Sequence, residues 1–115
     1  MEKPARQWMF LRAVRERGRV ELVELARRIG LSSTHLGRIE NGRAANPSWR
    51  TVEAWGRELG VSMRLIGYIQ DHPAVDELVA DWAARMVVGM YPEEQIIDEI
   101  EARYGPIPRP PHPGP

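Results

Sequence analysis

The segment 30–42 carries short polar side chains where a surface helix usually carries long charged ones. Only Leu36 and Ile39 are placed to anchor such a helix to a core. The polar positions between and around them are Ser33, Thr34, His35 and Arg38. Short hydroxyl side chains let a helix approach another surface closely, and an arginine fork fits phosphates and guanine edges. These residue types therefore predict recognition by hydrogen bonding.

Four expected helices between residues 6 and 60 must position these side chains. Apolar residues recur there at helical spacing, and glycine or Asn-Gly closes each segment. The expected spans are residues 6–17, 21–29, 33–40 and 49–59, and the expected buried face of the last is Trp49, Val52, Trp55 and Leu59. Gly30, Leu31 and Ser32 alone separate the second helix from the third. Two short helices joined by so tight a turn are typical of a helix-turn-helix motif.

The C-terminal part of the chain gives weaker signals. Residues 62–69 alternate in polarity and are rich in β-branched and aromatic types, which favours a short strand over a fifth helix. Two further helices are expected at residues 74–90 and 92–104. Their apolar stripes are Val75, Leu78, Val79, Trp82, Met86 and Met90 in the first, and Ile96, Ile97 and Ile100 in the second. Residues 105–115 form a Pro-rich tail, which is expected to be extended and disordered.

The net charge of zero hides an asymmetry along the 115 residues. Residues 1–70 hold 13 Lys and Arg against 7 Asp and Glu, a net charge of +6. Residues 71–115 hold 3 against 9, a net charge of −6. This division predicts a polyanion-binding domain over 1–70, a helical dimerisation or partner segment over 71–104, and the tail. Uneven surface charge without a role is the alternative.

Several classes of protein find no support in the sequence. There is no cysteine, so neither a disulfide framework nor a thiolate zinc site is available. The three histidines, His35, His72 and His112, lie in unrelated contexts without metal-ligand spacing, and no nucleophile stands beside a base. We therefore expect no enzyme, no metal and no cofactor. No apolar run approaches the roughly 20 residues of a membrane span, so no membrane contact and a cytoplasmic location are expected.

Three fragments occur in an order typical of one known family. They are "ELARRIGLS", "LGRIENG" and "NPS" followed by "LGV". Through them, residues 11–61 resemble the Cro/repressor-type helix-turn-helix family, also called the xenobiotic-response-element family. The resemblance implies a mainly α fold, a lambda-repressor-like domain of five helices, here followed by C-terminal helices. It also implies a dimer that places its third helix in the DNA major groove.

The resemblance assigns roles to individual residues by position. Base edges would be read by Ser33, Thr34 and Arg38. Asn41 and the Gly42 backbone fall where the family touches phosphates. Ser32, His35, Arg43 and Arg50 are further candidates for backbone contacts, and for His35 and the two arginines a solvated side chain is the alternative. Arg15 and Glu40 fall where the family often has a buried ion pair, which would fix the angle of the reading helix more than add stability.

The sequence also departs from the family pattern. Glu21 and Leu22 stand where the second helix usually begins with Ser or Thr and then Gln, so a phosphate contact is expected to be missing. Arg19 occupies a position often held by glycine. The connection over residues 43–46 is one residue longer than usual, which leaves contacts around Arg43 open.

The sequence thus predicts a prokaryotic or phage transcriptional regulator, such as a repressor, that binds double-stranded DNA as a homodimer on a pseudo-palindromic operator. Self-association or partner binding would use Leu78, Val79, Trp82, Met86, Ile96, Ile97 and Ile100. One alternative is an antitoxin that regulates its own synthesis and wraps a toxin with residues 71–104. Another is an adaptor that docks on a protein such as RNA polymerase without contacting DNA.

Overall fold

A computed structural model describes residues 3–109, and within that range it contains helices and no strand. The helices are α1 (Arg6–Arg17), α2 (Leu22–Ile29), α3 (Ser33–Glu40), α4 (Trp49–Leu59), α5 (Met63–Asp71), α6 (Glu77–Val88) and α7 (Glu93–Tyr104). The mainly α fold predicted from the sequence is confirmed.

Local hydrogen bonds set most of the helix boundaries. The side chains of Ser32, Ser48, Ser62 and Asp76 each accept a hydrogen bond from a backbone N–H three residues ahead, and so cap α3, α4, α5 and α6. Gly30 and Gly60 end α2 and α4 with φ of +80° and +74°, in the left-handed region that glycine enters without strain.

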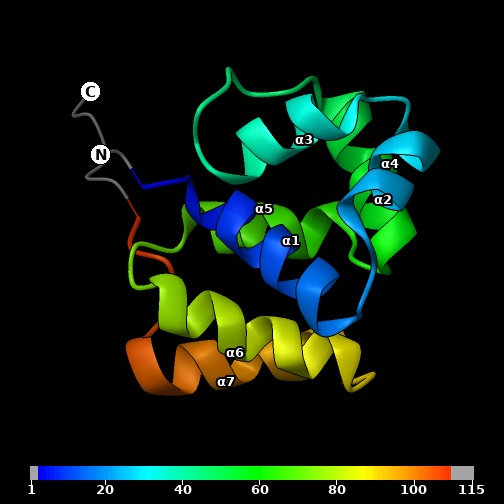
Figure 1. Cartoon of the computed structure of the whole chain (residues 1–115). Coiled ribbons are helices and arrows are strands. Elements are labelled where there is room, and N and C mark those ends of the chain that lie inside the picture. Colours follow the sequence, from blue (N-terminus) through cyan, green and yellow to red (C-terminus); the bar gives the residue numbers. More distant parts are fainter. Residues whose placement is uncertain (1–2, 110–115) are drawn as a thin grey trace.

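The helices are arranged in layers around α1 (Figure 1). Helices α1 and α5 lie in the middle, with α2, α3 and α4 on one side and α6 and α7 on the other. Helix α1 packs more extensively against α6 than any other two helices pack together. The α6–α7 layer therefore lies on the side of α1 opposite to α3.

One continuous apolar core runs through all three layers. Phe10 and Leu11 of α1 are fully buried, as are Leu36 of α3 and Ile100 of α7. Trp8 stacks on Trp55 with ring centroids 5.4 Å apart and rings nearly parallel. Because both side layers contribute to the same core, the fold depends on α6 and α7 as well as on the first five helices.

The strand expected over residues 62–69 is wrong, because this segment forms α5. Ser62 caps the helix, and Leu65, Ile66 and Ile69 form a buried stripe at helical spacing. Over so short a segment, the alternating polarity of a strand and the i, i+1, i+4 spacing of a helix fit the same residues. The packing of the segment against α1, α4 and α7 favours the helix.

Three side chains of the expected apolar stripes lie at the surface of the chain: Trp49, Leu78 and Met90. Trp49 is 63 % exposed because it is the first residue of α4, a turn and a half before Trp55 enters the core. Leu78 is 79 % exposed on the outer face of α6, and Met90 lies beyond the end of that helix. Helix α6 is shorter than expected at both ends, since Asp76 caps it and Val88 is its last residue.

The other residues expected to bind a partner lie largely within the molecule. Trp82 is half-buried, and the buried ones are Val79, Met86, Ile96, Ile97 and Ile100. A partner surface on these two helices therefore depends on Leu78 and Trp82. Residues 105–109 form neither helix nor strand, and the remainder of the expected disordered tail, 110–115, falls outside the described residues.

Candidate nucleic-acid interface

Helix α3 presents its polar side chains outward because its two apolar residues face the core. Leu36 and Ile39 are almost fully buried, whereas Thr34, His35 and Arg38 are exposed. Ser33 is half-buried at the first position of the helix. In Figure 1 this helix lies at the edge of the molecule, so its outward face is free to meet another surface.

The corner before α3 has the geometry that the sequence predicts. Gly30 takes the left-handed conformation, Leu31 packs against the core, and the exposed Ser32 hydroxyl accepts a 3.1 Å hydrogen bond from the His35 N–H. Further along, a Cβ added at Gly37 would lie 3.3 Å from Leu22, so α2 and α3 cross at close range. The tight corner and this crossing together orient α3.

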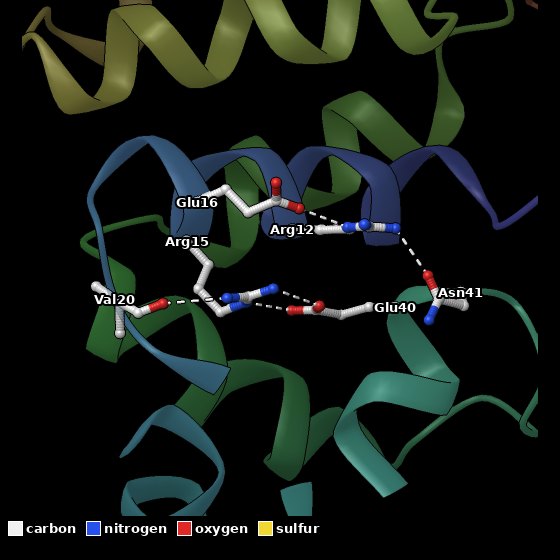
Figure 2. A network of polar contacts seen from close by, with 6 residues as sticks. All are labelled: Arg12, Arg15, Glu16, Val20, Glu40 and Asn41. Carbon is white, nitrogen blue, oxygen red and sulfur yellow. Dashed lines mark hydrogen bonds and ion pairs between the residues drawn. The ribbon is translucent and has the colours of Figure 1, made fainter. Parts of the chain in front are cut away.

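A buried ion pair connects α1 to the end of α3 (Figure 2). The Arg15 guanidinium donates to both Glu40 carboxylate oxygens at 2.8 and 2.9 Å and to the Val20 carbonyl at 3.1 Å. Only 13 % of the Arg15 side chain and 3 % of the Glu40 side chain are exposed. The hydrogen bonds to Glu40 raise the pKa of Arg15 above its ordinary value, so this cation stays charged.

A second connection from α1 holds Asn41, and the sequence reasoning missed it. Arg12 donates to the Asn41 side-chain oxygen at 2.7 Å and to Glu16 at 2.5 Å (Figure 2). With its oxygen held by Arg12, exposed Asn41 keeps its amide N–H groups turned to other partners. Nothing in the local sequence pairs residues 29 positions apart, although Arg12 lies one helical turn before Glu16.

The backbone N–H of Gly42 already has a hydrogen-bond partner within the chain. Its N–H donates to the Ile39 carbonyl at 3.0 Å, and its φ is +74°. A Cβ at this position would lie 2.8 Å from Pro4, so the segment before α1 packs on Gly42. Any contact of this loop with DNA phosphates would therefore come from its neighbours.

Three exposed arginines follow one another along this part of the chain: Arg38 on α3, Arg43 in the loop after it and Arg50 in the first turn of α4. Arg38 donates to the Arg43 carbonyl at 3.3 Å, and the Arg50 guanidinium lies 5.8 Å from the centroid of the Trp49 ring. Among the described residues, Arg38, Arg43 and Arg50 form no ion pair with a carboxylate. Unpaired guanidinium groups are available to phosphates and base edges.

Trp49 is an exposed ring beside Arg50 in the first turn of α4. It follows the capping Ser48 at the start of α4, close in sequence to the loop after α3. Its exposure could have been predicted from its position. A residue directly after the capping residue lies at the end of the apolar stripe of the helix, where the stripe leaves the core.

Other kinds of site find no support within residues 3–109. The structure contains no group of three or more acidic or histidine side chains placed to hold a metal ion there. None of the described helices is both long and apolar enough to cross a membrane.

The comparisons with known proteins agree with this geometry. A family model described as a helix-turn-helix domain matches residues 9–66, half of the chain, from the first turns of α1 into α5. Neither a curated protein nor a solved structure matches. Helices α6 and α7 lie outside the matched region. With the two short helices, the tight corner and the family match in agreement, the chain belongs to the helix-turn-helix domain family, a family of DNA-binding domains.

Proposed function

We propose that this protein is a sequence-specific DNA-binding transcriptional regulator that inserts α3 into the major groove. The observation that carries the proposal is the outward face of α3, where the short polar side chains share the helix with Arg38, an exposed arginine that contacts the loop at Arg43. The major groove distinguishes all four base pairs, and it admits an α-helix whose exposed side chains are short.

The residues divide into two roles under this proposal. Ser33, Thr34 and Arg38 read base edges, with Arg38 leaving the Arg43 carbonyl to donate two of its N–H groups to a guanine. Arg43, Arg50 and the Asn41 amide contact phosphates, as do Ser32 and His35 at the start of the helix. Such phosphate contacts supply affinity and make it fall with salt concentration.

We further propose that two copies bind one pseudo-palindromic operator, with their α3 helices about 34 Å apart. Both helices must then face the same side of the duplex, so the two-fold axis runs parallel to the direction in which α3 faces DNA. The outer surface of α6 and α7 points away from α3 (Figure 1). The dimer contact therefore belongs on a lateral surface of the molecule and not on the outer surface of α6 and α7.

The decisive experiment measures discrimination among DNA sequences. Protection mapping on the DNA upstream of the protein's own gene supplies a candidate operator, and fluorescence anisotropy then compares it with scrambled DNA. Arg38→Ala should reduce the preference for the operator by about 1–3 kcal/mol, as loss of a bidentate guanine contact does. Thr34→Ala should reduce it to a smaller extent.

Arg103→Ala is the matched control, because it removes an exposed arginine from the far side of the molecule. It should leave the preference unchanged. The proposal fails if the Arg38→Ala and Arg103→Ala variants prefer the operator over scrambled DNA to the same extent. It also fails if the affinity for DNA does not depend on salt concentration.

A further inference from the structure

The outer surface of α6 and α7 carries an apolar groove, which we call the Trp82 groove. One hollow of about 140 Å³ is lined by Leu78, Trp82, Arg103 and Tyr104, together with two buried core residues. A second hollow of about 350 Å³, on the other side of Trp82, is lined in part by Arg85, Tyr91 and Glu99. A cavity of about 150 Å³ accepts a benzene ring, so the first hollow has room for one large apolar side chain.

The composition of the groove is that of a protein-binding site. Leu78 is the most exposed leucine that the structure describes, and Tyr91 and Tyr104 are about half exposed. Trp82 lies between the two hollows with the Arg103 guanidinium 5.1 Å from its ring centroid. Tryptophan, tyrosine and arginine in a partly desolvated pocket are the residue types that dominate binding energy at protein interfaces.

The charge of the groove is opposite to that of the segment that builds it. Residues 71–115 hold nine carboxylates and three arginines, and two of those arginines, Arg85 and Arg103, line the groove. Neither forms an ion pair within the part of the chain that the structure describes. Each hollow is therefore lined by one unpaired cation, the first by Arg103 and the second by Arg85.

The carboxylates of α6 and α7 mostly point elsewhere. Asp81 pairs with Arg17 of α1, Glu94 with Arg64 of α5, and Glu101 accepts a 3.0 Å hydrogen bond from the Tyr68 hydroxyl. Of the acidic residues, only Glu99 lines the groove. The positive groove is thus a local feature within an acidic surface.

We propose that the Trp82 groove binds a short acidic segment of another protein. One aromatic or leucine side chain of that segment fills the hollow between Leu78 and Tyr104, and its carboxylates pair with Arg85 and Arg103. Because the groove faces away from α3, this partner and DNA bind at the same time. The protein then connects a DNA site to a second protein.

Two other occupants fit the groove less well. A nucleic acid strand would extend past the two arginines onto the acidic surface around them, where like charges repel it. A second copy related by a two-fold axis would bring groove against groove, so that four arginines would be buried with only two carboxylates, those of Glu99. A short acidic segment meets neither obstacle.

The test uses the full chain and a fluorescent synthetic peptide of about twelve residues, in which one Trp and two Leu alternate with Glu and Asp. Anisotropy should report saturable binding that weakens with salt. Arg85→Glu with Arg103→Glu should weaken binding about tenfold or more, because two charge-assisted contacts become repulsive. Leu78→Gln, at a site too exposed to affect folding, removes the apolar contact without adding charge and should also weaken it.

The controls separate this groove from the DNA surface. Arg38→Ala removes an exposed arginine near α3 and should leave peptide binding unchanged, while Arg85→Glu with Arg103→Glu should leave operator binding unchanged. Three results overturn the proposal: no peptide binding at about 1 mM, equal binding of a peptide with Lys in place of its acidic residues, and tighter binding of single-stranded DNA at the groove. A concentration-dependent dimer that Leu78→Gln dissociates in sedimentation would also overturn it, in favour of a second copy.

Discussion

At the scale of single residues, two arginines on one face of α1 hold the far end of α3. Arg15 donates hydrogen bonds to Glu40 and Arg12 donates one to Asn41, so two consecutive residues at the C-terminal end of α3 are each bonded to α1 (Figure 2). The two attachments differ in burial, because Arg12 is exposed and Arg15 is largely buried. Removal of one partner should therefore lower the free energy of unfolding strongly only for the buried pair.

Glu40→Gln should therefore lower the free energy of unfolding by about 3 kcal/mol, because it leaves the Arg15 charge buried without compensation. Urea denaturation followed by circular dichroism measures the change. Glu24→Gln is the matched control: it also removes a carboxylate bonded to arginine, but an exposed one, so it should cost less than about 1 kcal/mol.

A double variant separates stability from orientation. Arg15→Met with Glu40→Leu should recover most of the lost stability, since apolar pairs often replace buried ion pairs without loss. If the pair fixes the angle of α3, this stable double variant still discriminates poorly between operator and scrambled DNA. Normal discrimination in it would assign the pair to stability alone.

The residue scale also shows where sequence reasoning reached its limit. The α3 side chains were predictable, because Leu36 and Ile39 define the inward face and leave Thr34 and Arg38 outside. The Arg12–Asn41 contact was not, because it depends on the angle between α1 and α3. Exposure of Trp49 was missed because hydrophobicity alone assigned it to the core, whereas its first-turn position places it beyond the core.

At the scale of elements, the helices with strong local signals were predicted well. The corner between α2 and α3 depends on Gly30 and Ser32, whose roles are local. Helix α5 was missed because its local sequence fits both a strand and a helix, and only its contacts with other helices favour the helix. A Cβ added at Gly56 of α4 would lie 2.5 Å from the Val61 carbonyl oxygen and 2.8 Å from Ile66, so α5 begins in direct contact with α4.

Two glycine-to-alanine substitutions test that contact. Gly56→Ala should destabilise the protein, since backbone at Val61 must move to admit the methyl group. Gly67→Ala lies within α5 with no neighbour within 4 Å, so it should stabilise by about 0.5–1 kcal/mol through helix propensity. Thermal unfolding compares the two variants. Equal stabilities of the two variants would mean that α4 and α5 do not meet at Gly56.

At the scale of the whole molecule, ion pairs join the basic and acidic parts of the chain. Arg17 holds the pKa of Asp81 below its ordinary value, and Arg64 does the same for Glu94. Their stabilisation is complete above the ordinary carboxylate pKa, near 4, and is lost as pH falls through the lower folded values. The sequence predicted the charge division but not that the two parts pair with each other.

Acidification should therefore lower the urea midpoint of the wild type between about pH 5 and pH 2. Arg17→Ala with Arg64→Ala should flatten this dependence, because the two carboxylates then titrate closer to their unfolded values. Both pairs are exposed, so high salt should reduce the difference between the proteins. An unchanged pH dependence in the double variant would mean that the pairs do not join the layers in solution.

The arrangement of layers predicts the effect of removing α6 and α7. A chain that ends after residue 72 loses the partner with which α1 packs most extensively, and it exposes apolar side chains of the shared core to water. We expect it to lose cooperative thermal unfolding and, as a consequence, DNA binding. A chain that ends after residue 109 keeps all seven helices and should unfold as the full chain does.

If residues 71–104 served dimerisation alone, the shorter chain would instead fold as a stable monomer with intact binding to a single half-site. Calorimetry together with half-site anisotropy distinguishes the two outcomes, since only the layered fold predicts that both signals disappear together.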